Sequence, residues 1–122
     1  MSKNFINING EILDAEDKIF NISNRGFKYG DGLFESMRMS SGKLNFANLH
    51  ADRLQNGMKI LKLEGYSTLD TYFLKDKVEE LCKRNKVGPN ARLRLNVYRD
   101  GGGFYAPSQN KHGYTLEVIP LN

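Results

Sequence analysis

The sequence predicts an α+β domain: a mostly antiparallel sheet of about five or six strands with two helices packed on one side. Two observations lead to this prediction. Near both ends of the 122-residue chain, apolar and polar residues alternate with the period of a strand. Between about residues 48 and 85, apolar residues recur every three or four positions, which is the period of a helix. A chain of this length builds one hydrophobic core, so residues 1–122 are expected to form a single domain.

Two hairpins are expected in the first part of the chain. Residues 5–13, FININGEIL, alternate on both sides of Asn9-Gly10, a pair that readily adopts the positive φ angles of a tight turn. Residues 33–46, LFESMRMSSGKLNF, alternate as well and turn at Ser41-Gly42. Between the hairpins, residues 25–32, RGFKYGDG, contain three glycines, which predicts a loop of special geometry.

Two helices are expected in the middle of the chain. The first begins with Asn48 as its cap, ends at Gly65 and buries one face, made of Leu49, Leu54, Met58 and Leu61. The second runs from about Leu69 to Asn85, and Gly88-Pro89 stops it. Its expected buried residues are Tyr72, Phe73, Leu74, Val78, Leu81 and Cys82.

Two further strands are expected near the C-terminus. Residues 91–100, ARLRLNVYRD, alternate strictly, with Leu93, Leu95 and Val97 toward the core. Residues 114–121, YTLEVIPL, follow a glycine-rich loop and form the last strand.

Composition excludes several classes of protein. The formal net charge of +4 favours anionic ligands but does not name one. Lysines alternate with acidic residues along the predicted helices, which indicates solvated faces and no nucleic-acid partner. No apolar run is long enough for a membrane span or a signal peptide, so we expect no membrane partner and a cytoplasmic location. The single cysteine, Cys82, is interpreted as a small buried hydrophobe, and no Cys or His spacing indicates a metal site.

The segment HADRL contains the first candidate binding residue. Arg53 lies one helical turn after His50, near the start of the first predicted helix, where a guanidinium suits a bidentate contact with phosphate. A surface ion pair of Arg53 with Asp52 or Glu64 is an equally supported alternative. We interpret His50 as a hydrogen-bonding residue at the helix start.

A second candidate arginine stands at the end of a strand. Arg99 precedes a glycine-rich loop, a place where binding sites are often built, and a substrate carboxylate suits its guanidinium. A salt bridge of Arg99 to Asp100 or Glu117 is the alternative. On an earlier strand, Glu35 and Arg38 are expected to face a cavity or each other.

Three segments at the observed intervals, NRGFKYGDGLFESMRM, SGKLNF and NLHADRL, resemble the small N-terminal domain of the class IV aminotransferases. This family, also called fold type IV, includes branched-chain aminotransferases, D-amino-acid aminotransferases and 4-amino-4-deoxychorismate lyases. The resemblance covers nearly the whole chain and implies the same α+β fold. The strand that ends in Arg99 and leads into glycines is most similar to that of the lyases.

The resemblance implies a cofactor and a set of site residues. The cofactor is pyridoxal 5'-phosphate, and its phosphate is expected to bind Arg53. Arg99, Phe34, Tyr29 and Glu35 are expected on the substrate side, with a small carboxylate as substrate. Phe34 stands where D-amino-acid aminotransferases have a tyrosine. A homodimer is implied as well.

The resemblance also implies that the catalytic lysine and the acidic partner of the cofactor's pyridine nitrogen lie on a larger C-terminal domain. No lysine of residues 1–122 matches that role, so no catalytic residue is expected in this chain and the chain alone is expected to be inactive. The complete protein is expected to be a 4-amino-4-deoxychorismate lyase, which releases pyruvate and forms 4-aminobenzoate for folate synthesis. An aminotransferase of the D-amino-acid or branched-chain type is one alternative. A non-catalytic module that binds a phosphate-bearing ligand or a protein partner is the other.

Overall fold

The computed structural model describes residues 4–17, 24, 30–100 and 110–121. Its elements follow in the order β1 (Phe5–Ile8), β2 (Glu11–Asp14), β3 (Gly32–Ser40), β4 (Lys43–Leu44), α2 (Ala47–Ile60), the 3₁₀ helix η1 (Tyr66–Thr68), α3 (Thr71–Arg84), β5 (Ala91–Arg99) and β6 (His112–Pro120).

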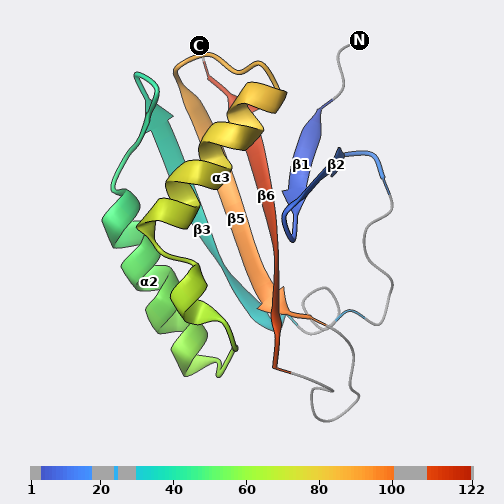
Figure 1. Cartoon of the computed structure of the whole chain (residues 1–122), viewed down its shortest axis with the longest axis vertical. Coiled ribbons are helices and arrows are strands. Elements are labelled where there is room, and N and C mark those ends of the chain that lie inside the picture. The colour runs from blue at the N-terminus through green and yellow to red at the C-terminus, as the bar shows by residue number, and fades with distance from the viewer. Residues whose placement is uncertain (1–3, 18–23, 25–29, 101–109, 122) are drawn as a thin grey trace.

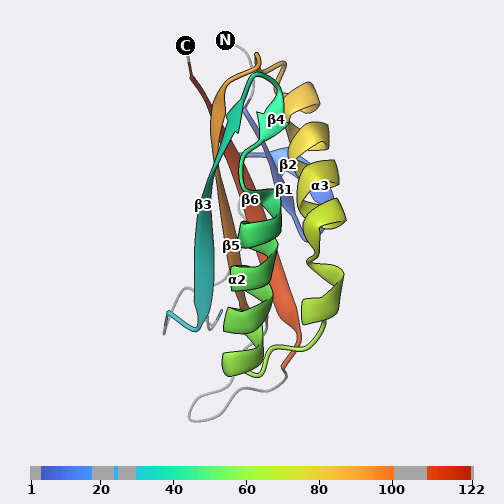
Figure 2. The same ribbon diagram turned by 90° about the vertical axis from the view of Figure 1, so that its left-hand side faces the viewer.

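The strands form one sheet of six strands in the order β2-β1-β6-β5-β3-β4, and each neighbouring pair is antiparallel. Helices α2 and α3 lie side by side over one face of this sheet, which gives two layers (Figures 1 and 2). Neither helix of the described part of the chain lies over the opposite face, and we call it the open face. The α+β architecture predicted from the sequence is therefore confirmed.

Both predicted hairpin turns are present. Asn9 and Gly10 have φ angles of 54° and 94°, and Ser41 and Gly42 have φ angles of 51° and 78°. Two consecutive positive φ angles match the right-handed twist of the strands that the turn connects. The sequence therefore determined both turns and the register that follows from them.

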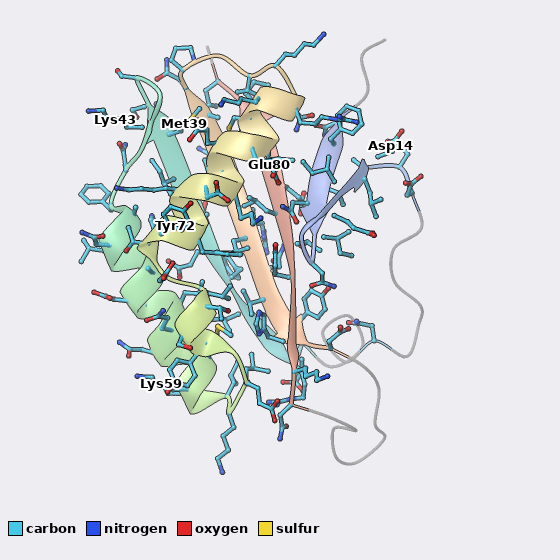
Figure 3. The ribbon with its side chains drawn as sticks, viewed as in Figure 1. Asp14, Met39, Lys43, Lys59, Tyr72 and Glu80 are labelled. Carbon is cyan, nitrogen blue, oxygen red and sulfur yellow. The ribbon has the colours of Figure 1, made fainter. Side chains whose placement is uncertain are left out.

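The hydrophobic core lies between the sheet and the two helices. Every second residue of β3 and β5 faces the helices, as their alternation predicted. Met39 of β3, for example, lies in this layer, whereas Lys59 projects from the far end of α2 (Figure 3). Burial of each large apolar side chain contributes about 1.5–3 kcal/mol. The most deeply buried residues of this core include Met37, Leu54, Met58, Leu74, Leu81, Leu93, Leu95 and Val97.

The start of α2 differs from its prediction. Phe46, at a φ angle of 56°, precedes the helix without a side-chain cap, and Asn48 lies inside the first turn. As a result Leu49 is 64% exposed, and the buried face of α2 is made by Ala47, Ala51, Leu54 and Met58.

The end of α2 also differs, because the helix stops well before Gly65. Lys62 adopts a φ angle of 58°, its N–H bonds to Lys59 O, and the Leu63 N–H bonds to Met58 O at 2.9 Å. This is a Schellman ending with lysine in the left-handed position, where glycine is the usual signal. Helix α3 ends in the same way, with Lys86 at a φ angle of 55°. The glycine signal therefore misplaced the end of α2.

Helix α3 differs from its prediction at its start and at Tyr72. Asp70 caps it by accepting a hydrogen bond from the Phe73 N–H at 2.9 Å, so the helix begins at Thr71 and Leu69 is buried just before it. Tyr72 is 77% exposed, against the prediction that it would be buried, because it points away from the sheet. In the described part of the chain, no helix is long and apolar enough to cross a membrane.

Candidate functional site

Strand β3 presents two different faces at the residues that follow its first glycine. Glu35 shares the helix-facing side with Met37 and is only 4% exposed, although it is charged. Phe34 lies on the open face and is exposed. A buried carboxylate costs several kcal/mol unless charged or hydrogen-bonding partners surround it, so the surroundings of Glu35 need explanation.

Two side chains of α2 surround the Glu35 carboxylate. Arg53 donates from Nε to both oxygens at 3.0 Å and from Nη2 to Oε1 at 2.9 Å. His50 Nδ1 lies 2.8 Å from Oε1. We call these three residues the Glu35 cluster. Two parallel, charge-assisted hydrogen bonds from Arg53 offset the cost of burying the Glu35 carboxylate. This is the geometry in which a guanidinium binds a carboxylate most strongly.

The two charged groups of the cluster differ in their exposure to solvent. The Glu35 carboxylate accepts hydrogen bonds from the Arg53 guanidinium and attracts its charge, which raises the pKa of Arg53. Yet the Arg53 side chain is 69% exposed, whereas that of Glu35 is 5% exposed. The guanidinium therefore has one edge against a buried carboxylate and the remainder in solvent. This arrangement can bind an anion from the solvent side.

Local packing explains how Arg53 reaches Glu35. Gly57, one turn after Arg53, faces β3, where a Cβ atom would lie 2.7 Å from Leu33 Cδ1. The missing side chain allows α2 to approach β3 closely. Both ion pairs that the sequence suggested for Arg53, with Asp52 or Glu64, are therefore replaced by a pair with Glu35. His50 is a hydrogen-bonding residue in the first turn of α2, as predicted, and the partner of its ring is Glu35.

Arg99, the last residue of β5, lies in a second group of polar residues at the start of β3. Arg99 is two positions after Val97 and four after Leu95 in β5, so its side chain points to the same side of the sheet as theirs, toward the helices. The residue is 7% exposed. Its Nε donates to Asp31 Oδ2 at 2.9 Å, Nη1 donates to Asn110 Oδ1 at 2.9 Å, and Nη2 donates to the Leu61 carbonyl. We call these residues the Arg99 cluster. The observed salt bridge is with Asp31 and not with Asp100 or Glu117.

The glycine after Asp31 has a packing role. A Cβ atom at Gly32 would collide with the Val97 carbonyl oxygen and would lie 2.9 Å from Tyr98 Cα. Only glycine allows β3 to begin this close to β5, and the same approach brings the Asp31 carboxylate to Arg99. The segment GDG therefore holds the sheet together at this end.

The open face presents a further arginine beside Phe34. The Arg94 guanidinium lies 4.4 Å from the centre of the Phe34 ring, and its Nε donates to Asn96 Oδ1 at 3.3 Å. Arg38 is on this face too, pointing away from Glu35, so the predicted pairing of Glu35 with Arg38 is wrong. No motif surrounds Arg94 in the sequence, but alternation along β5 turns it away from the core, as alternation along β3 does for Phe34.

The structure thus brings Arg53 and Glu35 together and separates them from Arg99 and Phe34. Tyr29 lies outside the described residues. Cys82 is buried, which raises the pKa of its thiol by desolvation and agrees with a packing role. Among the described residues, no three His, Cys, Asp or Glu side chains gather in a way that could hold a metal ion.

Comparison with known proteins gives one consistent family. The family model described as Amino-transferase class IV matches residues 32–121. The chain is 30% identical over 109 residues to the aminodeoxychorismate lyase of Bacillus subtilis (strain 168), which covers 87% of this chain and 36% of the relative. It is 32% identical over 92 residues to the D-alanine aminotransferase of Listeria monocytogenes serotype 1/2a (strain 10403S), which covers 75% of this chain and 29% of the relative.

The fold also matches a solved structure. The branched-chain aminotransferase of the archaeon Thermoproteus uzoniensis superposes with a TM-score of 0.83 at 19% sequence identity, covering 99% of this chain and 42% of that chain. At this identity the match shows the shared fold. The chain spans about a third of the length of the two curated relatives.

Proposed function

Because the chain belongs to the class IV aminotransferase family, we propose that it is the small domain of an enzyme in which Arg53 binds the phosphate of the cofactor. The cofactor of this family is pyridoxal 5'-phosphate. One observation supports the assignment above all: Arg53 is held by a buried carboxylate while most of its side chain remains exposed to solvent.

The residues of the Glu35 cluster fit a phosphate. A guanidinium carries five N–H donors in one plane, and Glu35 occupies only the edge formed by Nε and Nη2. The remaining Nη1 and Nη2 donors match the oxygens of a phosphate. When bound, pyridoxal 5'-phosphate supplies an electron sink for reactions at the carbon next to an amino group. The work of this domain is to bind and orient the cofactor's phosphate end.

We propose that the rest of the complete protein supplies the catalytic lysine and the acidic partner of the pyridine nitrogen. The short coverage of the curated relatives supports this proposal, because about two thirds of each lies outside the match. Residues 1–122 alone are therefore expected to be inactive in the assays below. The homodimer and the cytoplasmic location stay predictions.

For the reaction, we propose 4-amino-4-deoxychorismate lyase activity for the complete protein. The relative from Bacillus subtilis that bears the name aminodeoxychorismate lyase matches over more of this chain than the D-alanine aminotransferase does, which favours the lyase. Amino-group transfer is the second candidate, because the aminotransferase match has similar identity.

One pair of assays separates the two reactions. A lyase supplied with aminodeoxychorismate releases pyruvate and 4-aminobenzoate without any 2-oxo acid acceptor. A transferase turns over only when an amino donor, such as D-alanine, and an acceptor, such as 2-oxoglutarate, are both present. Transfer without any pyruvate from aminodeoxychorismate would overturn the lyase assignment. Absence of both activities and of cofactor binding would favour the non-catalytic module.

The open face suggests a contact for the substrate carboxylate. The predicted substrate role of Arg99 requires a carboxylate to reach a guanidinium that belongs to a residue only 7% exposed and that already has three partners in the Arg99 cluster. Arg94 is more accessible, because it is exposed beside Phe34 on the open face. We therefore propose Arg94 alongside Arg99 as a residue that contacts the substrate, to be tested by the effect of Arg94→Leu on KM.

A further inference from the structure

We propose that Glu35 is a positioning residue that fixes the Arg53 guanidinium in the orientation required for the phosphate, with His50 fixing Glu35 in turn. This inference rests on the proposed function of Arg53. It assigns to Glu35 a role different from the substrate contact that the family resemblance suggested, because its carboxylate is turned toward α2 and away from the open face.

The contacts fix the carboxylate from two directions. Oε1 lies within hydrogen-bonding distance of His50 Nδ1, at 2.8 Å, and of Arg53 Nη2, at 2.9 Å, while Oε2 accepts from Arg53 Nε at 3.0 Å. His50 and Arg53 are one turn apart on α2, so one rigid helix holds both partners. His50 therefore prevents the carboxylate from following Arg53 if the arginine swings outward.

The pair of hydrogen bonds from Arg53 to Glu35 determines which N–H donors of the guanidinium remain for a ligand. A planar guanidinium that uses Nε and Nη2 toward Glu35 must direct its Nη1–Nη2 edge elsewhere. No described residue accepts a hydrogen bond from Arg53 Nη1, and the side chain is 69% exposed while Glu35 is nearly inaccessible behind it. The free edge thus has a fixed direction before any ligand arrives. The loss of rotamer freedom that a flexible arginine suffers on binding has already occurred.

Charge alone predicts the opposite effect of Glu35. A carboxylate in contact with Arg53 lowers the net positive charge near an incoming phosphate dianion, so its removal by Glu35→Gln would strengthen binding if attraction of charges were the only effect. Under the positioning role, Glu35→Gln weakens binding because the guanidinium loses its pair of hydrogen bonds to the carboxylate and becomes free to turn. The sign of the change therefore discriminates between the two explanations.

The experiment measures dissociation constants of the complete protein for two probes, pyridoxal 5'-phosphate and pyridoxal, which lacks the phosphate. For Glu35→Gln we expect affinity for pyridoxal 5'-phosphate to fall by about tenfold and affinity for pyridoxal to change by less than about twofold. The control is Glu79→Gln, which removes an exposed carboxylate of α3 paired with Lys83 and should change neither constant. Unchanged or tighter binding of pyridoxal 5'-phosphate in Glu35→Gln, or equal weakening of both probes, overturns the inference.

A second variant covers the case in which Glu35→Gln fails to fold. Arg53→Lys keeps the positive charge, but a single ammonium that pairs with Glu35 has no second planar edge to present. We expect it to lose affinity for pyridoxal 5'-phosphate by about tenfold with pyridoxal spared. Affinity equal to that of the wild type would overturn the inference. A wild-type protein that does not bind pyridoxal 5'-phosphate would overturn the proposed function itself.

Discussion

Each of the two clusters pairs an arginine with an acidic residue, and the two acidic residues, Asp31 and Glu35, are close in the sequence. The clusters differ in how far the guanidinium is exposed to solvent. In the Arg99 cluster, three nitrogens of the guanidinium are engaged and the residue is 7% exposed. In the Glu35 cluster, one edge of Arg53 is engaged and the side chain is 69% exposed. An ion pair by itself therefore does not distinguish a structural arginine from one that binds a ligand. What differs between the two arginines is their exposure to solvent, which leaves donors of Arg53 accessible to a ligand.

The two clusters also connect different elements of the fold. Asp31 and Glu35 both face the helices, but Asp31 meets the end of the neighbouring strand β5, and Glu35 meets the flank of α2. The Arg99 cluster joins β3, β5 and the end of α2, since Arg99 also bonds to the Leu61 carbonyl. We expect mutations there to lower stability, in addition to any effect on the proposed substrate contact of Arg99, and mutations at the Glu35 cluster to act on ligand affinity.

The largest effect is expected for Arg99→Leu. The substitution leaves the Asp31 carboxylate, itself largely buried, without its guanidinium partner. Removal of one partner of a buried ion pair lowers the free energy of unfolding by about 3 to 5 kcal/mol. Urea denaturation followed by circular dichroism measures the loss. The control is Arg94→Leu, an exposed arginine of the same strand, whose cost should stay below about 1 kcal/mol. Equal stability of the two variants would contradict the structural role of Arg99.

Gly32→Ala should have the next largest effect. Its Cβ would meet backbone atoms of Val97 and Tyr98, which cannot move without separating β3 from β5. We expect a loss of about 3 kcal/mol, the upper part of the range for overpacking.

Gly57→Ala is the matched comparison at the Glu35 cluster. Its Cβ would meet only the flexible end of Leu33, and alanine favours the helix by about 1 kcal/mol, so the net change in stability should be small. A large loss for Gly57→Ala together with a small loss for Gly32→Ala would reverse the expected ranking of the two sites.

Arg53→Ala tests the ligand-binding side of the comparison. We expect affinity of the complete protein for pyridoxal 5'-phosphate to fall by about tenfold to a hundredfold, because the charge-assisted hydrogen bonds to the phosphate are lost. Fluorescence titration with pyridoxal 5'-phosphate measures the change, and Lys59→Ala, an exposed residue farther along α2, serves as control. Cofactor affinity equal to that of the wild type would show that Arg53 is a surface residue paired with Glu35 and nothing more.

The smallest effect is expected at the end of α2, which supplies the Leu61 carbonyl to Arg99. Lys62 has a φ angle of 58°, and a residue other than glycine is strained there. Lys62→Gly should raise the free energy of unfolding by about 1 kcal/mol. Lys59→Gly, inside the last turn of the same helix, should lower it by about as much. Thermal unfolding of both variants provides the comparison, and a loss of stability in both would show that the strain at Lys62 is negligible.

The sequence determined the features that depend on neighbouring residues. Alternation predicted the strands and their faces, and Asn9-Gly10 and Ser41-Gly42 predicted two turns. The helical period predicted that α2 and α3 exist, although not the start of either helix or the end of α2. Local signals failed where the chain departs from the common choice of residue, as at Lys62, which occupies a position that glycine usually marks. The burial of Arg99 could also have been predicted from the sequence, since alternation places it on the same side of β5 as Leu95 and Val97.

Only the tertiary structure decided which charged groups meet. Glu35 and Arg53 are 18 positions apart in the sequence, and Arg99 and Asp31 are 68 apart. Their pairing depends on how closely α2 approaches β3 and β3 approaches β5. Gly32 is required for the second approach, and Gly57 leaves room for the Leu33 side chain in the first. The sequence showed two arginines suited to anions. Burial and the geometry of each carboxylate then left a free edge on Arg53 and engaged three nitrogens of Arg99, because a donor enclosed by the fold must find its partner inside the fold.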